Sequence, residues 1–476
     1  MFGDEWGGGF VLSARRFGRR ACAAGLVASA SLAACAKAGA RPVTRHGGTT
    51  LTVALDVYAL KQYGTVTTRS ALYAKVLAQF EQAHPGIRVR QVPFLPTPQN
   101  QTAIIAGTAP DVFPDCCVYG SYVWGNLLLP LTDLLRRDNV NLGVFSPGIV
   151  RWLTFPSGVF GLSRQTDANA FAVDFGMLDT LGVAHPAPNW TAADFLRIAT
   201  ATSRPARNGK AARHGATFIY GGINVLREFT HGFGARVLNA ARTRQDLASP
   251  EGIAAGRWWF ERLLWPGVAT SGFASTPGQT AIQNLDMNAV LRLYTAWRTN
   301  PNWRFYQAPA YAHGPSTAMA GNFWGIPRTT RHPDQAWLLL RWLALGTVWQ
   351  RFTMRTFLFP PALNHLLAEW QHTVESTVPG LRHRGLGAFV TAATSGWADV
   401  AELNLAYASS QASAIDAYWW GQIQTRKVGV HIGFTQADHA VNTLQQTATT
   451  QRTQARAATA HYPSKGPRIA TVTPGL

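Results

Sequence analysis

The spacing of apolar residues near the start of the chain predicts a strand, a helix and a second strand in that order. Residues 51–55 form a β-rich run, and residues 71–84 place apolar side chains such as Leu72 and Phe80 on one helical face. A Pro-Gly pair ends this helix, and residues 87–92 alternate as a half-buried strand. A strand, a helix and a strand in this order make a βαβ unit, so the pattern predicts an α/β fold with parallel pairing.

A second helix and strand follow directly. Residues 99–106 are predicted to form a short helix that Gly107 ends in the left-handed conformation, and Pro110 precedes a short buried strand at 111–113. The loop at 114–120 comes next. Ligands in open α/β sheets bind beyond the carboxyl ends of strands, so this loop is a candidate wall of a binding cleft.

Two later segments carry clear signals for the start of a helix. Thr191 is a good N-cap, and Asp194 can complete a capping box with it. Ser249 is followed by Pro250 and Glu251, which places a cap, a proline at the first helical position and an acid in the first turn. Both segments are therefore predicted to begin helices.

Several motifs occur in one order along most of residues 50–455. They are Phe-x-x-x-His-Pro-Gly-Ile at 80–87, Gly-x-Ala-Pro-Asp-Val at 107–112, Trp-Thr-x-x-Asp-Phe at 190–195, Gly-Asn-Phe-Trp-Gly-Ile-Pro at 321–327 and Pro-Asp-Gln-Ala-Trp at 333–337. This ordered set resembles the family 1 extracellular solute-binding proteins of bacterial ABC importers. One departure lies at Val173 and Asp174, where the family has Tyr-Asn.

The resemblance implies an α/β fold of two lobes, the type II periplasmic-binding-protein-like fold. Each lobe would be a mixed, mostly parallel sheet flanked by helices, with the ligand cleft between the lobes. The expected segments are 49–160 and 310–365 for lobe 1, 161–309 and 366–457 for lobe 2, and 458–476 for a mobile tail.

Residues 1–35 have the pattern of an export leader, with two Arg pairs before a short apolar stretch. Leu-Ala-Ala-Cys at 32–35 resembles a bacterial lipobox, which implies cleavage before Cys35 and a lipid on this cysteine. A cysteine in an ordinary cleaved leader is the alternative, and both the Sec and the twin-Arg export routes are left open. Residues 36–48 are small, polar and Gly-rich, so we expect a flexible tether.

The net charge of the chain changes the predicted function and partners only modestly. The chain of 476 residues has 43 basic and 24 acidic residues, a formal net charge of +19. Nucleic-acid binding would require basic residues gathered on a face or tail, whereas these are scattered beyond the N-terminus, so no nucleic-acid partner is expected. Few carboxylates must be protonated as the pH falls, which predicts tolerance of acid.

The cysteines and histidines give no metal or redox motif. Beyond the leader, the cysteines Cys116 and Cys117 are adjacent, and they form either a vicinal disulfide or two reduced thiols. The 13 histidines are spread out without the spacing of metal ligands. We therefore expect no metal and no other cofactor.

A sugar site needs aromatic platforms for the apolar faces of the rings and polar side chains for the hydroxyls. The resemblance implies which positions line the cleft. The candidate ligand-binding residues are Asp56, Tyr58, Asp115, Tyr119, Gln165, Asp167, Trp297, Asn322, Trp324, Arg355 and Trp419. For each aromatic residue, packing in the core is an equal alternative. Each polar residue can instead serve as a cap or turn residue.

The expected function is that of the substrate-binding component of an ABC importer, without catalysis. By the resemblance, a lipid-anchored monomer outside the cell membrane captures a small solute, above all a mono- or oligosaccharide, and delivers it to the permease by hinge closure. The positive charge keeps anionic sugars among the candidate ligands.

Two other classes of protein remain as alternatives. A secreted glycan hydrolase could use paired carboxylates such as Asp56 and Asp115. Acids are scarce in this chain, however, and no catalytic motif accompanies them. A basic adhesin or structural surface protein would bind polyanions without closing on a ligand.

Overall fold

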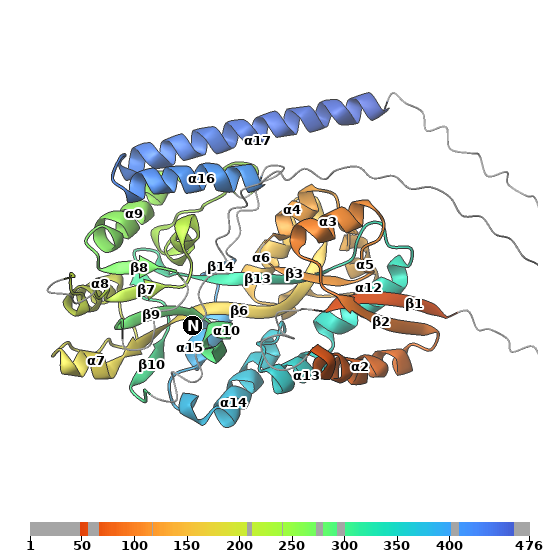
Figure 1. Cartoon of the computed structure of the whole chain (residues 1–476), viewed down its shortest axis with the longest axis horizontal. Coiled ribbons are helices and arrows are strands. Elements are labelled where there is room, and N and C mark those ends of the chain that lie inside the picture. Colours follow the sequence, from red (N-terminus) through yellow and green to blue (C-terminus); the bar gives the residue numbers. More distant parts are fainter. Residues whose placement is uncertain are drawn as a thin grey trace, which may run out of the picture. The chain divides into compact units, whose positions relative to one another are not determined.

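The computed structural model describes most of the chain after the leader (Figure 1). The described residues are 48–55, 66–116, 118–206, 212–239, 241–272, 279–292, 300–400 and 409–460. Several expectations from the sequence lie outside them: the leader with Cys35, nearly all of the tether, Asp56, Tyr58, Cys117, Trp297 and the tail from residue 461.

The first βαβ unit is confirmed. Strand β1 (Thr49–Leu55) is followed by helix α2 (Val66–Ala83) and strand β2 (Ile87–Pro93). The two strands pair in parallel, with Thr49 opposite Ile87. One face of α2 packs against the strands, because its apolar residues recur at the helical spacing and are buried together.

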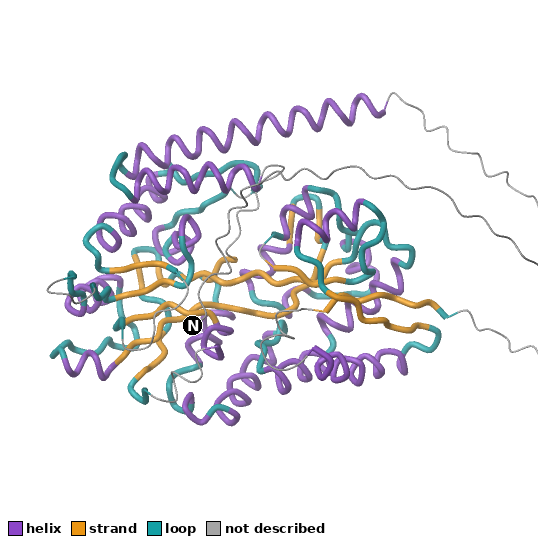
Figure 2. Tube along the Cα trace, viewed as in Figure 1, coloured by secondary structure: helices purple, strands orange, loops and turns teal. Residues whose placement is uncertain are grey.

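A mixed sheet forms the centre of the fold, and Figure 2 shows its strands with helices on both faces. The strand order is β14-β13-β6-β9-β7-β8, with β3 paired to β13 and β10 paired to β6. The bounds are β3 Phe113–Cys116, β6 Gly161–Asp174, β7 Ala216–Phe218, β8 Ala269–Ser271, β9 Ile282–Asp286, β10 Trp303–Tyr306, β13 Thr317–Gly325 and β14 Ala398–Val400. β6 and β13 are antiparallel, whereas β7 pairs in parallel with both β8 and β9.

Shorter elements surround this sheet. The helices are α3 Thr97–Ile105, α4 Tyr119–Trp124, α5 Thr132–Arg137, α6 Pro147–Leu153, α7 Phe175–Thr180, α10 Met287–Arg292, α12 Pro333–Leu345 and α13 Thr347–Phe357. Two small hairpins are β4–β5 (Thr154–Phe155, Gly158–Val159) and β11–β12 (Ala310–Tyr311, Gly314–Pro315). The 3₁₀ helices η2 (Gly222–Glu228) and η3 (His231–Phe233) precede irregular stretches at 234–239 and 241–249.

Apolar side chains form two large cores. The first core contains β1, α2, α6 and α12, and the second contains α7, α8 (Ala192–Thr202), α9 (Pro250–Arg257) and the π-helix η4 (Trp258–Leu264). Strand β6 contributes to both, with Ala172 in the first core and the neighbouring Phe171 and Val173 in the second. This strand therefore links the two cores.

The described chain after residue 366 contributes to both cores. Helices α14 (Leu367–Thr377) and α15 (Gly387–Thr394) pack in the first core. The indole nitrogen of Trp370 donates to the carbonyl of Leu358 at 2.8 Å, and Phe389 packs edge-on against Phe305. These contacts join residues 367–394 to the first core, whereas the final two helices of the described chain contribute Trp420 and Phe434 to the second.

Both predicted helix starts are confirmed. Thr191 and Asp194 form a reciprocal capping box, in which each backbone N–H donates to the other residue's side chain at 3.0–3.2 Å. Ser249 accepts a hydrogen bond from the backbone N–H of Gly252 at 3.1 Å, and Pro250 begins α9. In each case the side chain satisfies an N–H that the helix leaves without a partner.

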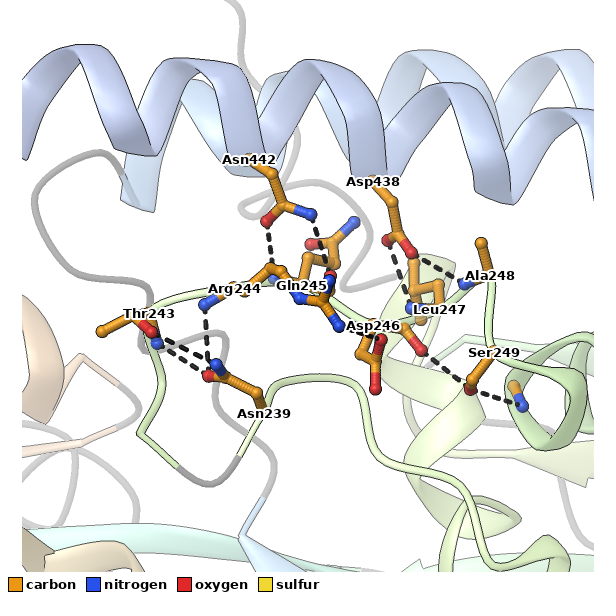
Figure 3. Close-up of polar contacts among 11 residues, drawn as sticks. Asn239, Thr243, Arg244, Gln245, Asp246, Leu247, Ala248, Ser249, Asp438 and Asn442 are labelled. Atoms are coloured by element: carbon orange, nitrogen blue, oxygen red, sulfur yellow. Dashed lines mark hydrogen bonds and ion pairs between the residues drawn. The ribbon is translucent and has the colours of Figure 1, made fainter.

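The last two helices, α16 (Ser409–Gln424) and α17 (Val430–Ala460), form a hairpin that holds residues 245–248 (Figure 3). Asp438 accepts hydrogen bonds from the backbone N–H groups of Leu247 and Ala248 at 3.1 and 2.7 Å. Asn442 makes two hydrogen bonds with the backbone of Gln245, at 2.8 and 3.0 Å. An irregular segment is thereby fixed in place, because helix side chains satisfy its backbone groups.

In the part of the chain that the structure describes, no helix is both long enough and apolar enough to cross a bilayer.

Candidate functional site

A cavity of about 930 Å³ lies between elements of the two cores. One wall comes from α6 and from residues in and beside β14. The other comes from the end of η2, the segment that follows it and the turn between β11 and β12. The lining residues are Gly148, Val150, Arg151, Trp152, Thr154, Arg227, Thr230, His231, Gly234, Ala235, Arg236, Val237, Leu238, Asn239, Arg242, His313, Gly396 and Val400. Its volume suits a small-molecule ligand, for which cavities of roughly 300–1,000 Å³ are usual.

The ionisable side chains that line this cavity are all basic or imidazole groups. Among the described residues they are Arg151, Arg227, Arg236, Arg242, His231 and His313, and no Asp or Glu is among them. Arg227 is buried, whereas Arg151 and Arg236 are exposed. The cavity therefore combines an apolar wall around Trp152 with several cationic hydrogen-bond donors.

Arg242 joins the two walls of the cavity. Its guanidinium donates to the carbonyls of Trp152 at 2.8 Å and Thr154 at 3.4 Å, and also to that of Arg151. It lies 4.3 Å from the ring centroid of Phe155. The last carbonyls of a helix lack partners within the helix and favour a nearby cation, so Arg242 caps α6 across the cavity.

Arg151 and Gly148 hold α6 against β14. The Nη2 group of Arg151 donates to the carbonyls of Gly396 and Ala398 at 3.0 and 3.1 Å. A Cβ at Gly148 would lie 2.2 Å from the carbonyl oxygen of Ala398, so only glycine allows this close approach. This wall of the cavity is consequently built from tightly packed backbone.

We expect Arg242→Ala to loosen the contact between the two walls. Loss of charge-assisted hydrogen bonds to the end of α6 should lower the free energy of unfolding by about 1–2 kcal/mol. Small-angle X-ray scattering of the ligand-free variant should give a larger radius of gyration. The matched control is Arg244→Ala, because Arg244 lies in the same segment but pairs with its neighbour Asp246 at 3.1 Å. Equal behaviour of the two variants would contradict a role for Arg242 between the walls.

The residue next to Arg227 takes no part in the cavity lining and is buried in the sheet instead. Glu228 accepts hydrogen bonds from Asn169 (2.5 Å), Asn284 (3.0 Å), Thr317 (2.9 Å) and the backbone N–H of Ala318 (3.1 Å). Burial raises the pKa of Glu228 to about 7, although these hydrogen bonds oppose the rise. The carboxyl group ties η2 to β6, β9 and β13, and so positions Arg227 at the cavity.

The predicted residues Asp115 and Tyr119 lie inside the first core. Asp115 accepts hydrogen bonds from the hydroxyl of Tyr122 at 2.6 Å and from Thr97 at 3.1 Å, and burial raises its pKa. The hydroxyl of Tyr119 donates to the carbonyl of Leu153 at 3.2 Å and accepts from a backbone N–H at 2.8 Å. Both side chains have protein partners in this structure.

Four other predicted residues lie on the long central strands. Asp167 accepts hydrogen bonds from the backbone and side-chain nitrogens of Asn288, at 3.2 and 2.5 Å. The side-chain oxygen of Asn322 accepts from Arg164 at 3.1 Å. Gln165 and Trp324 line a second pocket, which holds only about 20 Å³. The structure thus brings Gln165 and Trp324 together. Arg164 lines the same pocket and connects it to Asn322 through its hydrogen bond.

The last two described candidates lie on helices α13 and α16. Arg355 is exposed on α13 and pairs with Glu369 at 2.8 Å. Trp419 is half-buried on α16, with its ring 5.2 Å from that of Tyr418. None of the described candidates lines the large cavity, and their contact with a ligand stays a prediction.

Sequence reasoning missed the residues that do line the cavity. One signal was present: between residues 221 and 245 the chain carries four arginines and a histidine but a single acid, Glu228. The opposite wall, around Arg151 and Trp152, gave no signal because its residues are remote in sequence.

Comparison with known proteins gives consistent results. The family model described as "Bacterial extracellular solute-binding protein" matches residues 63–345, more than half of the chain. A comparison with curated protein sequences gives no significant match.

Solved structures share the fold at low sequence identity. A sugar transporter from Rhizobium etli in an open conformation is 16% identical, with a TM-score of 0.65 over 83% of this chain and 99% of its own. The sugar-binding protein MalE of Xanthomonas citri is 15% identical, with a TM-score of 0.64 over 85% and 100%. The cyclic alpha-maltosyl-1,6-maltose binding protein of Arthrobacter globiformis is 16% identical, with a TM-score of 0.63 over 84% and 100%. Because the family model matches more than half of the chain, and the two cores with a cavity between them agree with it, the chain belongs to the bacterial extracellular solute-binding proteins.

Proposed function

We propose that this protein is the substrate-binding component of an ABC importer and captures a mono- or oligosaccharide outside the cell membrane. The observation that carries the proposal is the cavity of about 930 Å³ whose walls come from both cores. A ligand held there would contact both lobes at once, and solute receptors require this geometry for closure.

The similar solved structures support a saccharide as the ligand. They include proteins described as maltose bound, as sugar-binding and as in complex with cycloalternan. The cavity itself offers a large aromatic side chain, Trp152, beside hydrogen-bonding groups of Thr154, Thr230 and Asn239. An aromatic face against sugar C–H groups, with polar groups for the hydroxyls, is a common arrangement for sugar recognition.

Closure would act through contacts that strengthen when the lobes approach. Arg242 already reaches from the segment beside the second core to the end of α6 in the first. A ligand that bridges the same walls would add contacts available only in the closed state, and the equilibrium would shift toward that state by this difference in affinity. The permease would then recognise the closed form.

The family and the sequence of residues 1–35 support a location outside the cytoplasm. An extracellular solute-binding protein works outside the cytoplasm, and we propose that a lipid on Cys35 anchors this one at the outer face of the membrane. The ABC permease is the proposed protein partner, and a monomer is the proposed form. The candidates outside the described residues, Asp56, Tyr58 and Trp297, remain proposed ligand contacts together with those on the central strands.

A glycan hydrolase is less well supported by the cavity chemistry. Glycoside hydrolysis by the usual route needs two carboxyl groups that flank the scissile bond. The described residues that line the large cavity include no carboxylate, and Asp115 lies in the first core with its own hydrogen-bond partners. Release of product in the binding assay below would reverse this preference.

The test is a thermal-shift screen of the purified protein against neutral and acidic mono- and oligosaccharides, polyols and peptides. A ligand that binds only the folded state adds about 2.7 kcal/mol of stability at a hundredfold excess over its dissociation constant. We expect a saturable shift with one class of saccharide and unchanged sugar recovered afterwards. Stabilisation by peptides alone, or cleavage of an oligosaccharide, would contradict the proposal.

A further inference from the structure

We propose that the C-terminal hairpin of α16 and α17 sets the affinity of the cavity for its saccharide by holding the cavity wall at residues 237–239 in place. The positioning residues are Asp416 on α16 and Asp438 and Asn442 on α17. The inference rests on the proposed function, because it concerns ligand binding in the same cavity. A wall already held in its binding conformation loses less conformational entropy when the ligand binds, so the affinity is higher.

The wall at residues 237–239 is one arm of a short antiparallel loop. All three residues line the cavity. Leu238 lies opposite Gln245 in an antiparallel bridge, and two backbone hydrogen bonds of 2.9 and 3.0 Å flank this bridge. The position of the second arm, residues 244–246, therefore determines the position of the wall.

Helix α17 binds the second arm through its backbone, as Figure 3 shows. Asn442 accepts a hydrogen bond from the backbone N–H of Gln245 at 2.8 Å and donates one to its carbonyl at 3.0 Å. Asp438 accepts from the next two backbone N–H groups along the chain, those of Leu247 and Ala248. Because these hydrogen bonds join backbone groups, a change at Asn442 can move the wall without altering a side chain that lines the cavity.

The hairpin also contacts the wall directly. Leu238 packs against Ala412 of α16 and Val441 of α17, both of which are almost fully buried. Leu238 therefore belongs both to the cavity lining and to the small apolar cluster between the two helices. A shift of the hairpin would be transmitted to the wall through this packing as well as through the hydrogen bonds.

On α16, Asp416 connects the same arm with another part of the cavity lining. Asp416 is buried and accepts a hydrogen bond from the side chain of Gln245 at 2.7 Å. It also interacts electrostatically with Arg227, a lining residue on η2, and α16 packs against η2. The hairpin thus contacts the lining at Arg227 and at Leu238, and it fixes the loop arm that pairs with the wall.

Three variants test this role. Asn442→Ala removes both hydrogen bonds to the backbone of Gln245. Asp416→Asn keeps an acceptor for the side chain of Gln245 but removes the charge that acts on Arg227. The matched control is Val430→Ala, which truncates a buried side chain of α17 that packs in the second core and is not part of the cavity lining. The melting temperature without ligand compares the stability of all three.

Hydrogen–deuterium exchange of the ligand-free protein tests the position of the wall without any sugar. In Asn442→Ala, the N–H groups of Asn239 and Asp246, which flank the bridge, should exchange at least about tenfold faster than in the unmodified protein. The backbone N–H groups of α6, on the opposite wall, should exchange as before. In Val430→Ala, the exchange at Asn239 and Asp246 should stay as in the unmodified protein, even where the melting temperature falls.

Isothermal titration calorimetry tests whether the wall sets the affinity. The probe is whichever of maltose, maltotriose, galactose and galacturonate stabilises the unmodified protein most in the thermal-shift screen. We expect Asn442→Ala and Asp416→Asn to weaken its binding by about tenfold, the effect of losing roughly one hydrogen bond to the ligand. Val430→Ala should leave the dissociation constant within about twofold of the original value.

The outcomes separate this inference from the proposed function. Unchanged exchange at Asn239 and Asp246 in Asn442→Ala, or faster exchange with unchanged affinity, would overturn the inference while the saccharide-binding function stands. An equal loss of affinity in Val430→Ala would also overturn it, because general destabilisation would then explain the effect. If no saccharide in the thermal screen binds the unmodified protein, the proposed function is overturned, and the exchange data still decide whether the hairpin holds the wall.

Discussion

Replacement of Glu228 by alanine is expected to lower the free energy of unfolding by about 4 kcal/mol. The side chain is fully buried and accepts four hydrogen bonds from three strands. Without the Glu228 carboxyl group, the side-chain amides of Asn169 and Asn284 and the backbone N–H of Ala318 would be buried with donor hydrogens that lack an acceptor. Guanidinium denaturation at pH 5 followed by tryptophan fluorescence measures the loss.

Two control variants make this prediction specific. Glu261→Ala removes an exposed glutamate that pairs with Arg257 at 3.7 Å, and should change stability by less than about 0.5 kcal/mol. Glu228→Gln should lower the stability far less than Glu228→Ala. The side-chain oxygen of Asn169 has no hydrogen-bond partner, and after its amide group rotates by about 180° it could accept from the new glutamine amide. A loss for Glu228→Ala no larger than for Glu261→Ala would contradict the role assigned to this network.

Stability should fall as the pH rises from about 4.5 to about 7. Burial raises the pKa of Glu228 from 4.5 to about 7 and that of Asp416 from 3.8 to about 7. Across this range the unfolded chain has already released these protons while the folded chain retains them, so folding is favoured at the lower pH. A shift of this size in Glu228 alone corresponds to about 3 kcal/mol.

The carboxyl groups with lowered pKa values do not reverse this trend. Asp138, whose hydrogen bonds to Arg137 and Trp337 lower its pKa to about 2, is ionised throughout the range. Denaturation midpoints at half-unit pH intervals measure the slope, and Glu228→Gln should flatten it because the variant cannot titrate there. Stability that rises between pH 5 and 7 in the parent protein would contradict the assignment. Higher stability in mild acid agrees with the acid tolerance predicted from the scarcity of carboxylates in the sequence.

Local patterns predicted the local structure well. The capping box at Thr191 and Asp194 formed as expected because its hydrogen bonds join residues three apart. The first βαβ unit followed from periodicity alone, since neighbouring segments pair with each other. The family and fold were predicted from motifs kept in order along the chain, and the family match agrees with them.

The site could not be predicted in the same way. The large cavity draws on Arg151, Arg227 and His313, which no local pattern connects. Arg242 contacts the end of α6, about 90 residues away in the sequence. Its backbone is in the left-handed region, with a φ of +56°, where glycine or asparagine is more usual than arginine. Glu228 was overlooked because glutamate is usually exposed, and only the tertiary structure supplies its four partners.

The central claim, that this protein closes around a saccharide, is tested most directly by small-angle X-ray scattering during a titration. The sugar that stabilises the protein in the thermal screen should reduce the radius of gyration, and the change should saturate with one ligand per chain. Arg242→Ala should start from a more open form and require more ligand to reach the same end point. A radius of gyration that stays constant at saturating ligand would contradict closure, and with it the proposed mechanism of delivery.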